Sequence, residues 1–181
     1  AFEAAQKGLG LDNNDNRSHW VVGAVQLYMR QHDRAQAAYD RALELNPNDA
    51  DVLAQYAAFL LYVGRFPDAR AAIDRALRLN PHCPWWYYWL KGWCACWNAE
   101  YEDAIAAIER IGSPIPECRM VTIVSLMALG REDDARAAMA ELLKDAPHFN
   151  RTNTTLTQPF KDPAHLAQLL EPLEAAGLPT D

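Results

Sequence analysis

The sequence has little positive charge and no long apolar run. Its 181 residues include 17 Lys and Arg against 24 Asp and Glu, which gives a formal net charge of -7. A chain of this charge repels a phosphate backbone, so we expect no nucleic-acid partner. A membrane-spanning helix needs about 18 or more consecutive apolar residues, and the sequence has no such stretch. The first residues also lack the basic, apolar and small-residue order of a signal peptide. We therefore expect no membrane partner and a cytoplasmic location.

Catalytic and metal-binding motifs are also missing. The sequence contains no GxxxxGK, GxGxxG, GxSxG or HExxH pattern, so it encodes no phosphate loop, nucleophile elbow or zinc-protease helix. Its four cysteines show no paired spacing typical of a disulfide scaffold, which fits a reducing compartment. Cys94 and Cys96, two residues apart on a helix, would point to nearly opposite sides and could not share one ion. We expect no enzyme activity, no cofactor and no metal site in this chain.

What the sequence does contain is an internal repeat. Residues 34–47 read RAQAAYDRALELNP, and residues 68–81 read DARAAIDRALRLNP, 34 positions later. Two further copies follow at intervals of 35 and 31 residues. The matching positions of the four copies are Ala35, Tyr39, Ala42 and Pro47; Ala69, Ile73, Ala76 and Pro81; Ala104, Ile108, Ile111 and Pro116; and Ala135, Met139, Leu142 and Pro147. Because residues four and seven apart share one face of a helix and proline then ends it, each copy predicts a helix with one packed face.

A second apolar-periodic stretch precedes each of these helices. These stretches cover residues 19–29, 52–63, 86–97 and 120–129. Each repeat is therefore expected to be a pair of helices. Gly64 and Gly130 follow the first helix of their pairs, where glycine adopts the left-handed conformation of a helix C-cap at the least cost.

This pattern resembles the tetratricopeptide repeat (TPR), whose first helix carries a small residue that is matched here by Gly23 and Gly92. The resemblance implies an all-α, right-handed superhelix of helix-turn-helix repeats that binds proteins, with a C-terminal capping helix. The expected divisions are the second helix of an incomplete repeat in residues 1–15, four repeats in 16–49, 50–83, 84–116 and 117–147, and an extended segment with a C-terminal helix in 148–181. The incomplete repeat would leave Phe2 and Leu9 uncovered, and a second copy of the chain could cover them in a homo-oligomer.

Two segments show a narrower resemblance. The stretch LNPHCPWWYYWLKGWCACWNAEYEDAIAAI and the tail PFKDPAHLAQLLEPLEAAGLP resemble helical arrays that follow the catalytic domain of bacterial class III adenylate and guanylate cyclases. Related arrays follow winged-helix domains in some bacterial regulators. This resemblance implies a role in signal transduction, as the non-catalytic C-terminal part of a larger protein or as a free-standing relative.

An aromatic cluster is the most unusual feature of the sequence. Seven Trp and Tyr residues fall between positions 85 and 97, and Trp86, Trp89, Trp93 and Trp97 are spaced by three, four and four residues, on one face of a helix. TPR arrays expose part of each first helix on a concave groove, which implies that Trp86, Trp89 and Trp93 line it. The same spacing also fits a stripe buried between helices, and both alternatives stay open for each ring.

The same register places residues of every first helix on the groove wall. The candidate protein-binding residues are Trp20, Leu27, Gln55, Tyr62, Trp86, Trp89, Trp93, Met120, Val124 and Met127. The basic residues with which some TPR proteins hold a carboxylate are missing from these positions. A groove lined by Trp and Met suits an amphipathic or apolar segment of a protein or peptide. Such a surface needs a cover, which the chain's own C-terminal tail could supply.

The tail has two parts. Residues 148–163 are polar and without helical period, so we expect an extended or looped segment. Asp162 as N-cap and Pro163 at the first position then predict a short helix, which Pro172 is expected to kink or end early. The apolar face of this helix consists of Leu166, Leu169, Leu170 and Leu173. The helix either covers the groove or caps the fourth repeat.

Overall fold

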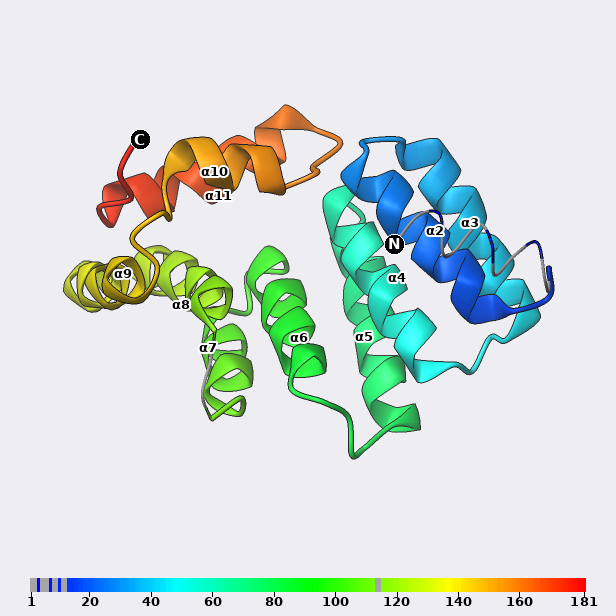
Figure 1. The fold of residues 1–181 in the computed structure, drawn as a ribbon. Helices are drawn as coiled ribbons and strands as arrows, with labels where there is room; N and C mark the ends of the chain where they lie inside the picture. Colours follow the sequence, from blue (N-terminus) through cyan, green and yellow to red (C-terminus); the bar gives the residue numbers. More distant parts are fainter. Residues whose placement is uncertain (1–2, 4–6, 8–9, 11–12, 113–114) are drawn as a thin grey trace. The chain divides into compact units, whose positions relative to one another are not determined.

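Helices are the only regular secondary structure in the described part of the chain, which is residues 3, 7, 10, 13–112 and 115–181 of this computed structural model (Figure 1). The chain forms two units. The first contains Ala1–Cys83 and Pro159–Lys161, and the second contains Pro84–Gln158 and Asp162–Asp181. The predicted all-α fold class is therefore confirmed. The helix predicted within residues 1–15 lies mostly outside the described residues.

From Asn16 onward, the first unit contains two helix pairs. They are α2 (Asn16–Tyr28) with α3 (His32–Leu45), and α4 (Ala50–Tyr62) with α5 (Phe66–Leu79). The helices of each pair pack along one another, and α4 also contacts both helices of the first pair. A Cβ atom at Gly23 would lie 3.0 Å from the ring of Tyr39, so a larger residue would push α2 and α3 apart.

The second unit also begins with two helix pairs. They are α6 (Trp86–Trp97) with α7 (Tyr101–Glu109), and α8 (Pro116–Ala128) with α9 (Glu132–Asp145). Two more helices follow, α10 (Arg151–Thr157) and α11 (Pro163–Ala175). α8 contacts both α6 and α7, and α11 packs on α8, where the predicted capping helix was expected.

Aspartate side chains begin the first helix of both pairs in the first unit. The carboxylate of Asp15 accepts hydrogen bonds from the amides of Arg17 and Ser18, and that of Asp49 accepts from the amides of Asp51 and Val52. Partial burial alone would raise the pKa of Asp49. Hydrogen bonds from the Asn16 side chain and the Val52 amide, together with the Arg17 guanidinium, outweigh this effect and lower the pKa of Asp49 below its ordinary value.

Replacing Asp49 by alanine is expected to lower the free energy of unfolding by about 1–2 kcal/mol at pH 7, because α4 loses its N-cap. The folded-state pKa of Asp49 is lowered, so its contribution is present above the unfolded-state pKa and is lost as the pH falls through the folded one. The difference between wild type and variant should therefore shrink below about pH 4. Urea unfolding at pH 7 and below about pH 4 measures this difference. The exposed Glu44→Ala variant is the control, and its free energy of unfolding is expected to stay within about 0.5 kcal/mol of the wild-type value. A difference that stays constant with pH would contradict the account.

The turn after each first helix uses a residue with positive φ. Gly64 (φ 79°) and Gly130 (φ 73°) take this position as predicted, whereas Arg30 (φ 58°) and Ala99 (φ 60°) take it in the other two pairs. In each case the following amide bonds back across the helix end, as the Glu100 N–H does to the Ala95 carbonyl at 2.9 Å. The left-handed conformation is disfavoured for residues with a Cβ atom, so Arg30 and Ala99 carry backbone strain.

Replacing Ala99 by glycine is accordingly expected to raise the free energy of unfolding by about 0.5–1 kcal/mol. The reverse change at the matching turn, Gly130→Ala, is expected to lower it by about 1 kcal/mol, since a Cβ atom there meets nothing within 4 Å and only the backbone angle opposes it. Thermal unfolding of both variants checks this. Two changes of the same sign would show that the turn angle is not the cause.

The tail differs from its prediction in two places. Residues 151–157 form α10, because Asn150 caps the amide of Asn153 at 2.7 Å and the Thr154 and Thr157 hydroxyls bond to carbonyls four residues earlier. The amide of Arg151 also donates to the Pro179 carbonyl at 2.8 Å. The predicted extended segment is therefore wrong for 151–157. Pro172 was expected to kink α11 or to end it early, and it does not end it, because the helix continues to Ala175.

Candidate functional site

The ten predicted groove residues are divided between the two units. Trp20, Leu27, Gln55 and Tyr62 lie in the first unit, and Trp86, Trp89, Trp93, Met120, Val124 and Met127 lie in the second. Three of them are buried, namely Leu27 at 2%, Trp93 at 7% and Met120 at 2% exposed. The other seven are half-buried. The three buried side chains offer a partner almost no surface, whereas the seven half-buried ones keep some.

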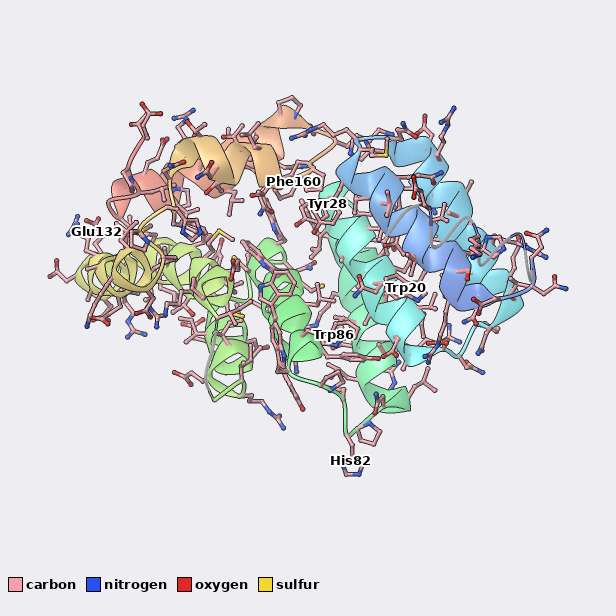
Figure 2. All side chains as sticks on the ribbon, in the orientation of Figure 1. Trp20, Tyr28, His82, Trp86, Glu132 and Phe160 are labelled. Carbon is pink, nitrogen blue, oxygen red and sulfur yellow. The ribbon has the colours of Figure 1, made fainter. Side chains whose placement is uncertain are left out.

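The aromatic cluster of α6 combines packed and accessible rings. Tyr87 is fully buried, and its ring centroid lies 4.3 Å from that of the half-buried Trp86. Trp85, at the N-cap position of α6, is 45% exposed. The guanidinium of Arg110 lies 4.6 Å from the ring centroid of Tyr88, a cation–π contact. The first two turns of α6 therefore combine buried rings with partly exposed ones, among them Trp86, which Figure 2 labels.

Helix α6 packs closely on α7 at Gly92. A Cβ atom at Gly92 would lie 2.9 Å from the Cδ1 of Ile108 and 3.3 Å from the Ala104 carbonyl oxygen. The next residue, Trp93, is buried in the core. Trp89, one turn earlier, keeps part of its ring exposed.

Two indole N–H groups have no acceptor in the described part of the chain. The Nε1 atoms of Trp20 and Trp89 are both buried and make no hydrogen bond there. A buried donor without a partner costs about 1–3 kcal/mol relative to a satisfied one. In the second unit, Trp89 thus combines a half-buried ring with an unused donor.

The chain's own tail covers two of the aromatic residues. In the first unit, the ring of Phe160 meets that of Tyr62 edge-on at 5.1 Å, and Tyr28 meets Tyr62 from another side at 6.4 Å. Figure 2 shows Phe160 and Tyr28 at the same end of the unit. In the second unit, His165 of α11 meets Trp97 edge-on at 5.9 Å. Sequence analysis missed Phe160 as a contact of Tyr62, and its only signal was an aromatic residue in a polar segment.

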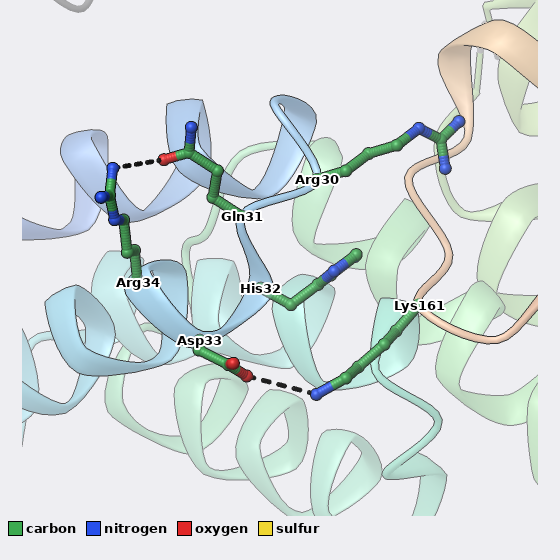
Figure 3. Close-up of a pocket in the computed structure, with 6 residues that line it drawn as sticks. All are labelled: Arg30, Gln31, His32, Asp33, Arg34 and Lys161. Carbon is green, nitrogen blue, oxygen red and sulfur yellow. Dashed lines mark hydrogen bonds and ion pairs between the residues drawn. The ribbon is translucent and has the colours of Figure 1, made fainter.

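A polar pocket lies beside the Phe160 contact in the first unit (Figure 3). Its volume is about 500 Å³. The lining residues are Arg30, Gln31, His32, Asp33, Arg34 and Lys161. Lys161 pairs with Asp33 at 3.3 Å, and Arg34 donates to the Gln31 side chain at 3.2 Å. The pocket is rich in cations but has no deeply buried charge, so it offers a surface for polar contact.

The described residues include no activated thiol and no cluster of metal ligands. None of the four cysteines forms a disulfide, and Cys94, Cys96 and Cys118 are buried. Burial raises the pKa of Cys96 and of Cys118 to about 11, which keeps both thiols protonated and poor nucleophiles at neutral pH. No group of three or more His, Cys, Asp or Glu in the described ranges could hold a metal ion. Within the same ranges, every helix is too short or too polar to cross a membrane.

Comparison with known proteins points to one kind of array. Models of the tetratricopeptide repeat match residues 26–84 and 59–112. The fold is similar to that of PilW, a type IV pilus biogenesis factor, at a TM-score of 0.72 and 21% identity, covering 96% of this chain and 79% of PilW. It is also similar to a thermophilic TPR protein in Thermus thermophilus, at a TM-score of 0.69 and 17% identity, with 93% and 88% covered.

A third similar structure is YrrB, a TPR protein with an unusual peptide-binding site, at a TM-score of 0.62 and 19% identity. The similarity covers 97% of this chain and 92% of YrrB. No curated protein matches the sequence. At these identities the likeness to solved structures shows the fold alone, which is that of a TPR array.

Proposed function

We propose that this tetratricopeptide-repeat array is a non-catalytic module that binds a protein or peptide through the tryptophan face of its second unit. The tryptophan face is defined as Trp86 and Trp89 of α6 with Val124 and Met127 of the adjacent α8. The proposal rests on the burial of the aromatic side chains of α6. Trp86 and Trp89 are half-buried, whereas Trp93 and Tyr87 are buried and anchor the helix in the core. Aromatic rings fixed in this way supply contact area at little entropic cost.

The chemistry of the face indicates its partner. Its four side chains are apolar apart from the indole N–H groups, and Met127 is flexible enough to adapt to different shapes. An amphipathic helix or another apolar segment would bury this surface.

Selection of binders tests this proposal. A random library of twelve-residue peptides would be panned against the full chain, and the affinities of selected peptides measured for wild type and Trp89→Ala. A loss of about 2 kcal/mol, roughly thirtyfold, is expected, since this is the scale of an aromatic hot spot. Leu156→Ala, which removes a 72% exposed side chain of α10 outside the face, serves as the control and should leave affinity unchanged. Selected peptides that bind Trp89→Ala as tightly as wild type would refute the proposal.

A second candidate function is that of a regulatory arm of a class III nucleotide cyclase whose catalytic domain lies outside this chain. Its support is the resemblance of the Trp-rich third repeat and of the tail, which here build α6, α7 and α11. In that case the tryptophan face would bind a segment of the same polypeptide. The reading frame upstream of the sequence decides this point, because a cyclase domain encoded there supports the arm and its absence excludes it.

A cytoplasmic place of action fits either function, because none of the four cysteines forms a disulfide and unpaired cysteine residues of this kind are typical of a reducing compartment.

A further inference from the structure

The segment Pro159–Lys161 is packed as a part of the first unit, although its neighbours Gln158 and Asp162 belong to the second. It lies between α10 and α11 and has neither helix nor strand. Pro159 and Phe160 are nevertheless buried, Phe160 to 6% exposure. We call these three residues the latch segment. Its burial comes from contacts that it makes as an irregular piece of chain.

Two hydrogen bonds hold the backbone of the latch segment. The Lys161 N–H donates to the Tyr62 carbonyl at 2.8 Å. Tyr62 is the last residue of α4, where carbonyls lack partners within the helix. At the other end, the Nε2 of His32 lies 2.9 Å from the Pro159 carbonyl oxygen, and because that oxygen can only accept, the ring nitrogen is the donor. These bonds recognise an extended backbone without regard to side chains.

Two side chains of the latch segment add selectivity. The Phe160 ring meets Tyr62 edge-on at 5.1 Å, the preferred geometry of an aromatic pair. The Lys161 ammonium pairs with Asp33 at 3.3 Å. This pair is exposed, with side-chain exposures of 54% and 96%, so it selects a basic residue more than it adds affinity. Proline at the first position supplies a buried apolar ring and an acceptor without a competing N–H.

We propose that Tyr28, Tyr62, His32 and Asp33 form a peptide-recognition site, the latch site, for an extended Pro–aromatic–Lys sequence. The chain keeps this site occupied with its own Pro159–Lys161, and a partner carrying the same sequence binds by displacing that segment. The latch site lies in the first unit and is separate from the tryptophan face of the second. A binding test of the latch site therefore says nothing about binding at the tryptophan face, and the reverse also holds.

Displacement is feasible because the latch segment has neither helix nor strand and part of its contact is exposed to solvent. The contact includes a ring pair, two hydrogen bonds to the backbone of the segment and an exposed ion pair, and the pocket that Arg30, Arg34 and Lys161 line includes the last residue of the segment (Figure 3). The latch segment is tethered at both ends, so its advantage over a free peptide comes mainly from its high effective concentration. Weakening the tethered copy should expose the site to the same sequence added in solution.

A fluorescein-labelled peptide of residues 156–164, LTQPFKDPA, tests the proposal on the full chain. Fluorescence anisotropy should show at least tenfold tighter binding to the Phe160→Ala chain than to wild type. The control peptide LTQPAKDPA should not bind either chain. Adding His32→Ala to the Phe160→Ala chain should weaken binding again, because the donor to the proline carbonyl is lost. Equal binding to wild type and Phe160→Ala, or no binding to Phe160→Ala, overturns the proposal.

A measurement on the wild-type chain covers the case in which Phe160→Ala does not fold, as judged by circular dichroism. The Lys161 amide, which donates to Tyr62, reports the closed latch by residue-resolved hydrogen exchange. An excess of LTQPFKDPA should speed exchange at Lys161 at least twofold, and LTQPAKDPA should not. Exchange at Lys161 that is unchanged by the first peptide overturns the proposal.

Discussion

Replacing Trp93 by alanine is expected to lower the free energy of unfolding by about 3–5 kcal/mol, the range for deleting a large buried aromatic side chain. Trp93 is 7% exposed and follows Gly92, where a Cβ atom would lie 2.9 Å from the Cδ1 of Ile108 in α7. The surrounding backbone cannot collapse into the space that the ring would leave, because Ile108 and the Ala104 carbonyl already confine α6. Urea unfolding followed by far-ultraviolet circular dichroism measures the loss.

Trp85→Ala is the matched control for this change. Trp85 is the same residue type in the same cluster but is 45% exposed, so its loss should change the free energy of unfolding by no more than about 0.5 kcal/mol. If both substitutions lowered the free energy of unfolding equally, the assignment of Trp85 to the surface and Trp93 to the core would be wrong.

Replacing Tyr39 by alanine is expected to have a comparable effect in the first unit, again about 3–5 kcal/mol. Tyr39 is 1% exposed, and its ring lies 5.3 Å from that of Phe59 and 5.8 Å from that of Tyr56. Burial, with a smaller effect of Tyr28, raises the pKa of its hydroxyl, so the side chain stays neutral at all ordinary pH values. The variant would lose these ring contacts and also the packing of the Tyr39 ring against Gly23 of α2.

Tyr28→Ala is the control, because Tyr28 is 61% exposed in the same unit. Its loss should cost about 1 kcal/mol or less, since it removes one exposed edge contact with Tyr62. Thermal melts of the two variants and wild type suffice. A Tyr39→Ala chain as stable as Tyr28→Ala would show that the repeat position of Tyr39 does not anchor the first pair.

The helix pairs were predictable because the interval of 34 residues repeats both the packing and the turn. Ala35 and Ala69 are completely buried, as their shared position in the repeat indicates. The turns at Gly64 and Gly130 are predictable because glycine readily adopts the positive φ that both residues have. Arg30 and Ala99 occupy the same left-handed position without that signal, because the geometry of the pair imposes the turn on whatever residue stands there.

The tail was less predictable because its helix depends on polar contacts. α10 has no apolar period, and hydrogen bonds from Asn150 and from the threonine hydroxyls stabilise it instead. The carbonyls of Pro179 and Thr180, near the other end of the tail, accept from its first amides. A periodicity of apolar residues cannot reveal partners of this kind.

The candidate site was predicted in outline. The spacing of Trp86, Trp89 and Trp93 indicates one helix face but not how deeply each ring lies. The depth depends on how α6 packs in the folded chain, where Trp93 is buried and Trp86 and Trp89 are half-buried. The Phe160 contact with Tyr62 joins residues almost a hundred positions apart, and no local pattern predicts a contact at that separation.

The central claim is that the tryptophan face of α6 binds a peptide while Trp93 serves the core. The most direct test is an indole ¹H–¹⁵N spectrum of the full chain, whose six tryptophans give six separate signals that single variants assign. At saturation with a peptide selected from the library, the signals of Trp86 and Trp89 should shift, while that of Trp93 stays in place. Saturable binding that leaves the Trp86 and Trp89 signals unmoved would contradict the claim.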